Sequence, residues 1–240
     1  MAKKFLVSML MFLMLFLFCG FRLDVSGFMG SSRMADYNAS KDVVQQFYEF
    51  HGYQTDMYGI NSSSGISLKL GFKINPKWEV YIRTDHIFSG QPEDRVYYET
   101  GELYQTGSAA FDSRYTGAGF KIYFKDFTYT ADFNPFLSVD AGALKSINSY
   151  ERKTWYEKEG NVIENAYSLY SGVVFSACIE AGADYYLAEK YGFFAVGGYR
   201  FFSGRFEGMI SSLNTIAFDG EKVYMAPDYS GIYAKIGIFV

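Results

Sequence analysis

Long stretches of the chain alternate between apolar and polar residues with a period of two, as β-strands do when their two faces meet different surroundings. In the longest stretch, Val173 and Phe175 share one face, whereas Ser176 lies on the other. Seven stretches show the pattern clearly: Ser64–Ile74, Trp78–Phe88, Ser113–Phe124, Pro135–Ile147, Ser171–Leu187, Gly192–Phe202 and Tyr229–Val240. A weaker eighth stretch runs from Phe21 to Met29. The sequence therefore predicts an all-β fold of eight antiparallel strands.

The connections between these stretches alternate between long and short. The long ones are residues 30–63, 89–112, 148–170 and 203–228, and the short ones are 75–77, 125–134 and 188–191. In an up-and-down sheet, all the long connections then leave the same end. This arrangement, with strands of about ten residues, is typical of a transmembrane β-barrel with short periplasmic turns and long extracellular loops. Within the first long connection, Ser40–Phe50 is predicted to form a short helix with Ser40 as its N-cap.

The polar faces of the strands distinguish a membrane barrel from a soluble one. A soluble barrel turns its apolar face inward, whereas a membrane barrel turns it outward to lipid. The polar faces carry seven cations and six anions: Arg22, Asp24, Lys69, Lys73, Glu79, Arg83, Asp85, Lys121, Asp140, Glu180, Asp184, Arg200 and Lys235. This near-balance suits a narrow interior, because a charge buried there without a partner costs several kcal/mol. The apolar faces are therefore expected to meet lipid.

Glycines and aromatic residues favour the same orientation. Eight glycines lie on the polar faces, where an eight-stranded barrel has little room: Gly71, Gly117, Gly119, Gly142, Gly182, Gly198, Gly231 and Gly237. Aromatic residues gather at strand ends, as an interfacial girdle requires: Phe72, Trp78, Phe124, Phe127, Phe133, Phe136, Tyr185, Tyr186, Tyr191 and Phe193.

Five of the charged residues lie about five to seven positions from the short-turn ends of their strands, near the middle of the membrane. They are Lys69, Arg83, Asp140, Glu180 and Lys235. We expect these five to form a charge network that closes the lumen.

The N-terminus has the organisation of a secretory signal. Two lysines precede an apolar run from Phe5 to Phe18, as in the charged and apolar regions of a signal peptide. We expect a signal peptide over residues 1–20, with a boundary that could lie as late as residue 27, and one barrel domain over residues 21–240. An uncleaved anchor and lipid attachment at Cys19 are the alternatives.

Candidate chemistry outside this framework is sparse. The net charge is -4 and no basic cluster lies beyond the N-terminus, which argues against a nucleic-acid partner. Only His51 and His86 could act as bases at neutral pH. Asp85 adjoins His86 but points to the opposite face, which argues against a Ser–His–acid arrangement of Ser89, His86 and Asp85. Cys178 is expected to fill space in the interior. We predict no catalytic, cofactor-binding or metal-binding residue.

Three segments resemble those of known proteins. Leu70–Val80 and Gly182–Gly192 resemble the periplasmic hairpins of small eight-stranded outer-membrane β-barrel proteins of the OmpA/OmpX/OmpW-like superfamily. Tyr229–Val240 resembles their C-terminal assembly signal. The resemblance implies export to the outer membrane of a bacterium with a double-membrane envelope. It also implies recognition of the C-terminal strand by the barrel-assembly machinery and long loops that meet surface ligands.

We therefore expect a monomeric outer-membrane β-barrel that is not an enzyme. Its role would be structural or surface interaction, with a closed, salt-bridged lumen and with outer-membrane lipid as its surroundings. Loop aromatics such as Tyr97, Tyr98 and Tyr104 could contact a surface ligand or could pack loop against loop. The main alternative is an OmpW-like channel for small apolar molecules. A lipid-modifying outer-membrane enzyme and a soluble lipocalin-like binder are further alternatives.

Overall fold

The computed structural model describes residues 21–32, 35–90, 93–125, 133–155, 162–188, 190–203, 206–212, 223–225 and 230–240. The predicted signal peptide, residues 1–20, lies outside the described residues. No helix in the described ranges is both long enough and apolar enough to cross a membrane.

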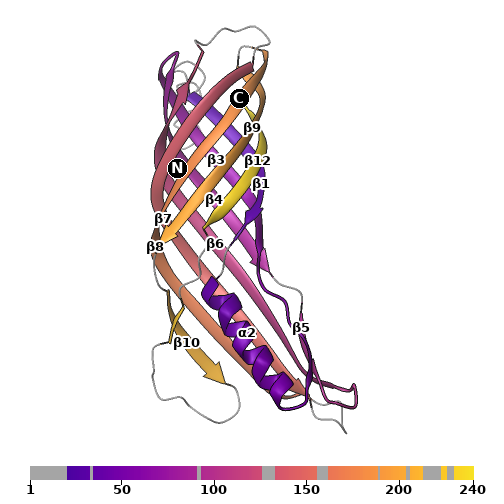
Figure 1. The fold of residues 1–240 in the computed structure, drawn as a ribbon. Helices are drawn as coiled ribbons and strands as arrows, with labels where there is room; N and C mark the ends of the chain where they lie inside the picture. Colours follow the sequence, from indigo (N-terminus) through magenta and orange to yellow (C-terminus); the bar gives the residue numbers. More distant parts are fainter. Residues whose placement is uncertain are drawn as a thin grey trace, which may run out of the picture.

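Eight antiparallel strands close into a barrel. They are β1 (Phe21–Ser31), β3 (Ser62–Asn75), β4 (Trp78–Gly90), β6 (Leu103–Tyr123), β7 (Phe133–Trp155), β8 (Val162–Ala188), β9 (Tyr191–Ser203) and β12 (Gly231–Phe239). Each pairs with the next barrel strand, and β1 pairs with β12, where Val25 lies opposite Ile238. The sheet therefore has no open edge within the barrel (Figure 1). The predicted eight-stranded, up-and-down barrel is confirmed, including its weaker first strand.

Three strands continue well beyond the barrel and, with a helix, form a second region that we call the extension. β6 and β7 stay paired from Tyr123 opposite Phe136 as far as Gln105 opposite Thr154. The extension comprises the outer parts of β6, β7 and β8 (103–111, 148–155 and 162–170), α2 (Ala35–Phe50), β2 (Gln54–Asp56), β5 (Asp94–Tyr97), β10 (Phe206–Ser212) and β11 (Val223–Met225). Figure 1 shows it projecting from the end opposite the short turns, with α2 beside the strands.

Much of what the sequence predicted as long loops is therefore strand. The expected loops over 89–112 and 148–170 were wrong in this respect, because β6, β7 and β8 run through them without a break in pairing up to Thr154. Between Asn148 and Thr154, Tyr150 is the only residue with a large apolar body, so no apolar face marks the strand. Backbone pairing with neighbouring strands continues where the apolar–polar contrast has ended.

The predicted helix is present but begins earlier than expected. It spans Ala35–Phe50, so that Ser40 lies inside the second turn and is not the N-cap. The capping assignment was wrong because Ser40 precedes an acidic and apolar run that resembles a helix start, whereas the helix already includes Ala35–Ser40.

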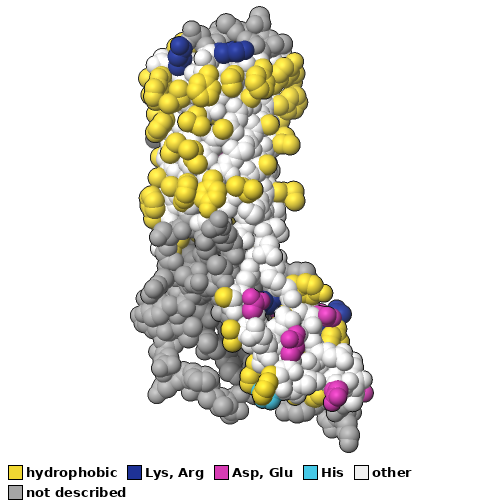
Figure 2. Space-filling model, viewed as in Figure 1, with side chains coloured by type: hydrophobic (Ala, Val, Ile, Leu, Met, Phe, Trp, Pro, Cys, Tyr) yellow, Lys and Arg dark blue, Asp and Glu magenta, His cyan; other side chains and the backbone are white. Residues whose placement is uncertain are grey.

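The two faces of the barrel strands meet opposite surroundings. Ile82 and Ile236 point outward and are 60% and 74% exposed, whereas their neighbours Arg83 and Lys235 point inward and are 0% and 4% exposed. Apolar side chains band the outer surface of the barrel in Figure 2, and acidic side chains appear on the extension. The apolar faces therefore form the lipid-facing surface that the charge balance predicted.

The expected aromatic girdle is only partly outward. Its exposed members are Phe72, Trp78, Phe124, Phe133, Tyr185, Tyr191 and Phe193, whereas Phe127 lies outside the described residues. Phe136 and Tyr186 are 1% and 2% exposed and face the lumen, so their assignment to the girdle was wrong. Adjacent residues on a strand point to opposite faces, so Tyr185 and Tyr186 cannot both face lipid.

Inward-facing apolar residues, five of them aromatic, fill the short-turn end of the lumen. The cluster consists of Tyr123, Phe136, Tyr186, Phe194, Val196 and Phe239. Glycines make room for such large groups: a Cβ on Gly117 would lie 2.0 Å from the hydroxyl of Tyr115, and one on Gly71 would lie 2.3 Å from the carboxylate of Glu79. The lumen of this eight-stranded barrel is thus occupied by side chains.

Candidate functional site: the charged lumen and the extension

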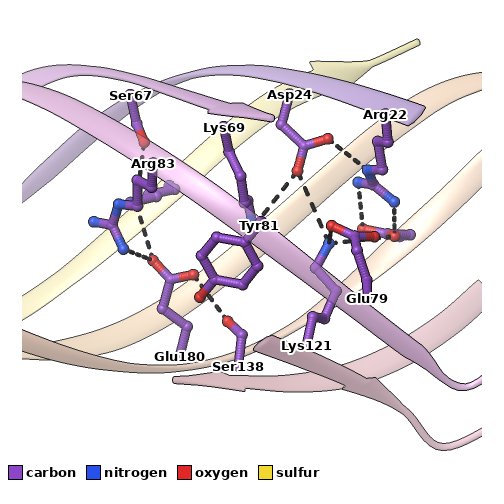
Figure 3. A network of polar contacts seen from close by, with 12 residues as sticks. Arg22, Asp24, Ser67, Lys69, Glu79, Tyr81, Arg83, Lys121, Ser138 and Glu180 are labelled. Carbon is purple, nitrogen blue, oxygen red and sulfur yellow. Dashed lines mark hydrogen bonds and ion pairs between the residues drawn. The ribbon is translucent and has the colours of Figure 1, made fainter. Parts of the chain in front are cut away.

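The barrel interior holds twelve buried charged side chains, six cations and six anions. They are Arg22, Lys69, Arg83, Lys121, Arg200 and Lys235, with Asp24, Glu79, Asp85, Asp140, Glu180 and Asp184. Each is at most 5% exposed. They come from all eight barrel strands and converge on the axis, and Figure 3 shows part of this network. Their formal charges sum to zero.

One group is centred on Arg83 of β4. Its Nη1 donates to Glu180 Oε1 at 2.7 Å and to Asp140 Oδ2 at 3.0 Å, and its Nε donates to Asp85 Oδ1 at 2.8 Å. The guanidinium therefore spans the lumen and joins β4 with β7 and β8. We call these residues, together with their partners Lys235 and Arg200, the Arg83 group.

Further cations complete the Arg83 group. Lys235 of β12 lies 2.9 Å from Glu180 Oε1, and Arg200 of β9 donates to Asp85 Oδ2 at 2.8 Å. The Tyr233 hydroxyl also donates to Glu180 Oε1, at 2.7 Å. Glu180 thus accepts from several donors, which offsets the cost of burying its charge.

A second group lies nearer the short turns and is centred on Arg22 of β1. Arg22 Nη2 donates to Asp184 Oδ1 at 3.0 Å, and Arg22 Nε lies 2.5 Å from Asp24 Oδ1. The Tyr123 hydroxyl lies between carboxylates, 2.9 Å from Asp184 and 3.0 Å from Glu79. These contacts tie β1 to β4, β6 and β8 across the interior.

Lys121 belongs to the second group but is held less directly. Its Nζ is 3.7 Å from Asp184 and 3.9 Å from both Asp24 and Glu79. At these distances Coulomb attraction acts without a direct hydrogen bond, and Lys121 Nζ, Asp24 Oδ2 and Glu79 Oε1 make none in the structure. The ring of Phe136 lies 4.2 Å from the ammonium and adds a cation–π contact.

The structure brings together four of the five residues singled out from the sequence. Arg83, Asp140, Glu180 and Lys235 all belong to the Arg83 group. Lys69 instead belongs to the second group, because its Nζ lies 3.5 Å from Asp24 Oδ2. Mid-depth placement was therefore too coarse to decide which anion a lysine reaches.

Sequence reasoning missed the tyrosine hydroxyls. Tyr81 and Tyr115 donate to opposite oxygens of Asp140 at 3.0 and 2.5 Å, and Tyr233 donates to Glu180. All three occupy the inward parity of their strands, which was a usable signal. Treating aromatic residues as lipid-facing obscured it. These hydroxyls complete the hydrogen bonding of carboxylates that Arg83 alone leaves partly open.

The candidate catalytic residues are separated by the wall of the barrel. His86 points outward, and its Nε2 lies 2.5 Å from Asp112 Oδ1 on β6. Asp85 and Ser89 are buried on the inner face, 1% and 5% exposed, so neither joins His86. His51 follows α2, and its Nδ1 lies 2.7 Å from the Phe47 carbonyl oxygen.

No metal site is apparent in the part of the chain that the structure describes, where no three His, Cys, Asp or Glu side chains gather in a way that could hold an ion. Cys178 is 1% exposed on the inner face and lies next to the Arg83 group, where it fills space.

The extension is held by a helix contact and by packed tyrosines. Asn38 of α2 donates to the Ile60 carbonyl at 3.1 Å and accepts from the Ile60 amide at 2.9 Å. Lys41 Nζ lies 2.5 Å from Asp94 Oδ1 and also donates to the Tyr58 carbonyl. Partial burial lowers the pKa of Lys41 below its usual value, although Asp94 opposes this shift.

Loop aromatics that could have formed a binding surface pack against one another. Tyr48 of α2, Tyr53, Tyr98 and Tyr104 lie with ring centroids 4.9 to 6.2 Å apart in tilted or edge-on pairs. Tyr48 also donates to Gln105 Oε1 at 2.7 Å. These rings attach α2 to β5 and β6, so that the extension is a packed structure.

Comparisons with known proteins find solved structures with a similar fold. No protein-family model and no curated protein matches the chain. The chain is similar to the solved structure of the outer membrane protein OprG from Pseudomonas aeruginosa, with 12% identity, coverage of 91% of this chain and 93% of that chain, and a TM-score of 0.50. Neisserial surface protein A also matches, with 11% identity, coverage of 92% of this chain and 96% of that chain, and a TM-score of 0.45. Ail of Yersinia pestis matches with 13% identity, the same two coverages and a TM-score of 0.41.

The closed sheet and the likeness to OprG define the class of fold. The chain has the fold of small eight-stranded bacterial outer-membrane β-barrels, consistent with the OmpA/OmpX-like proteins that its hairpins resemble. The fold supports a location in the outer membrane. At such low sequence identity the likeness shows the fold alone.

Proposed function

We propose that the protein is a non-enzymatic outer-membrane barrel that acts through its extension, as a structural or surface-interaction protein, while its lumen stays closed. The balanced set of six buried cations and six buried anions is the observation that carries this proposal. Ions or solutes would have to break several of these pairs to pass, because the pairs reach across the lumen between strands on opposite sides.

The extension supports the surface role. Its strands are continuous with barrel strands, so that its position relative to the membrane is fixed by backbone hydrogen bonds. Acidic side chains are displayed on it in Figure 2, whereas the barrel surface is mainly apolar. A structure of this size on the side opposite the short turns presents a stable surface to molecules outside the cell.

Conductance in planar lipid bilayers tests the closed lumen. We expect no steady single-channel current from the unmodified protein. Glu180→Ala removes the anion that contacts both Arg83 and Lys235, and it should either lower stability or open a water-filled path with measurable current. Steady conductance of the unmodified barrel that Glu180→Ala leaves unchanged would contradict the closed lumen. Uptake of a small apolar dye by vesicles containing the protein would then favour the alternative channel for apolar molecules.

Thiol labelling of whole cells tests the orientation. A cysteine in place of Glu99, which is exposed on the extension, should react with a membrane-impermeant reagent. A matched cysteine in place of Pro76, exposed in the turn between β3 and β4, should react only after the outer membrane is opened. Native Cys178 is buried and gives little background. Labelling of the Pro76 variant alone on intact cells would invert the proposed orientation.

A further inference from the structure

The outward faces of the barrel strands carry few charged or imidazole side chains, and these gather in one place. At the barrel-strand positions that the structure describes, the outward residues of this kind are His86, Asp112, Arg114 and Lys145. All four lie on three neighbouring strands, β4, β6 and β7, near the end from which the extension leaves. A random scatter of surface charge around the barrel would not produce this clustering.

Strand register places the three basic residues side by side. Arg114 on β6 lies opposite His86 on β4 and opposite Lys145 on β7. We call these three residues the cationic row. Asp112, the anion beside it, is engaged by His86 at 2.5 Å. Arg114 and Lys145 have no hydrogen-bond or ion-pair partner among the described residues, and both are exposed.

The cationic row lies at the same height as exposed apolar side chains of the outer barrel surface, which we call the apolar belt. Phe88, one outward position nearer the extension than His86, is 43% exposed and packs on the His86 ring with centroids 4.2 Å apart. Val173, opposite Lys145 on β8, is 66% exposed. The penalty for a lipid-facing cation is large at the midplane and small near the interface, where long basic side chains can reach the head groups.

We propose that the cationic row binds the phosphate-bearing head group of a lipid in the outer leaflet. The guanidinium of Arg114 can donate two parallel hydrogen bonds to one phosphate, and Lys145 supplies a point charge from the adjacent strand. Neighbouring strands are about 4.8 Å apart, so one phosphate can lie between the two side chains. The apolar side chains below the row receive the acyl chains of the same lipid. The choice of the outer leaflet rests on the proposed orientation of the extension, but the site does not depend on whether the lumen is closed.

Lipid binding to the folded protein in a non-ionic detergent tests this site. The probe is diphosphoryl lipid A, a glucosamine lipid with two phosphates, and retention of the lipid is measured by native mass spectrometry. Arg114→Gln combined with Lys145→Gln should weaken retention at least tenfold. The matched control, Lys77→Gln combined with Lys125→Gln, removes two exposed cations at the opposite end of the barrel and should leave retention unchanged. The same lipid without its phosphates should bind the unmodified protein as weakly as it binds the double variant.

A variant that should strengthen lipid binding controls for misfolding, because a misfolded protein would only bind more weakly. Asp112→Asn removes the anion beside the row, so it should strengthen retention of diphosphoryl lipid A several-fold. Millimolar inorganic phosphate should not displace the lipid, because binding also requires the acyl chains on the apolar belt. The proposal is overturned if the Arg114 and Lys145 variant retains the lipid like the unmodified protein. It is also overturned if both pairs of substitutions weaken retention equally, or if inorganic phosphate displaces the lipid.

Discussion

The barrel interior and the extension handle buried charge in different ways. In the barrel, twelve buried charges pair around two groups, and tyrosine hydroxyls complete the hydrogen bonding. In the extension, the described residues show one well-shielded ion pair, Lys41 with Asp94, together with packed aromatic rings and neutral hydrogen bonds. Lipid on the outside forces polar residues into the barrel, whereas water around the extension lets apolar rings pack inside it in the usual way.

The comparison predicts that loss of one charge is much more costly in the barrel than in the extension. Glu180→Ala leaves Arg83 and Lys235 without a shared anion at sites that are 0% and 4% exposed. We expect the free energy of unfolding to fall by about 3–5 kcal/mol unless water enters. Urea unfolding of the protein in lipid vesicles measures the change. Asp94→Ala, the matched loss of a carboxylate in the extension, should leave the barrel midpoint nearly unchanged, and equal effects of the two variants would remove the distinction.

Lipid exposure gives the second largest effect. Ala181 lies on the outward face of β8, within the membrane-spanning part of the strand, so Ala181→Arg should destabilise by about 2–4 kcal/mol. Ser108 has the same outward parity on β6 but lies in the extension, where Ser108→Arg should cost less than about 0.5 kcal/mol. Urea unfolding of both variants in the same vesicles measures the two changes in the free energy of unfolding. Equal tolerance of arginine at the two sites would mean that the outer face of the barrel does not meet lipid.

The same difference between regions explains what could be read from the sequence. The barrel strands were predictable because one face meets lipid and the other meets a charged lumen, which gives a clear alternation as in Ile179 and Glu180. The extension was not, because Asn148 to Thr154 has no apolar face although its backbone is paired. Strand detection by alternation fails wherever both faces have similar surroundings.

Within the lumen, the sequence predicted which residues belong to the charge network better than it predicted which of them form ion pairs with one another. Counting residues from the short turns placed Lys69 in one mid-depth network with Arg83 and Glu180, but the structure pairs Lys69 with Asp24. Strand tilt moves residues at equal count to different heights, and side chains as long as lysine reach over one further layer. The tyrosine donors, such as Tyr81 on Asp140, required knowing which face each ring occupies.

The ion pair of the extension should have a modest and local effect. Asp94→Asn removes the negative charge beside Lys41, whose side chain is 11% exposed, while the amide oxygen can still accept from the Tyr58 backbone amide. We expect the attachment of α2 to weaken by about 1 kcal/mol. Limited proteolysis should cut α2 several times faster, while the urea midpoint of the barrel stays constant. A shift of that midpoint would show that the extension and the barrel unfold as one unit.

The smallest expected effect is a pH dependence of the same attachment. Burial lowers the pKa of Lys41, so the detached segment, with a lysine pKa near its ordinary value of about 10.4, binds protons more strongly than the attached one. Between the lowered and the ordinary pKa, raising the pH therefore favours attachment of α2, and lowering it below that window removes the dependence. A cysteine in place of Ile60, which is 1% exposed beneath α2, reports detachment through its labelling rate.

Labelling of a cysteine in place of exposed Ser62 corrects for the chemistry of the thiol itself. The ratio of the Ile60 rate to the Ser62 rate should fall as the pH rises from 8 toward about 10, the range below the ordinary lysine pKa. With Lys41→Gln added to both variants, the fall of the ratio with pH should be lost, because the lysine that titrates in this range has been removed. A ratio that rises with pH in the presence of Lys41 would mean that attraction to Asp94 outweighs burial, and that the extension stabilises its charge in the same way as the barrel.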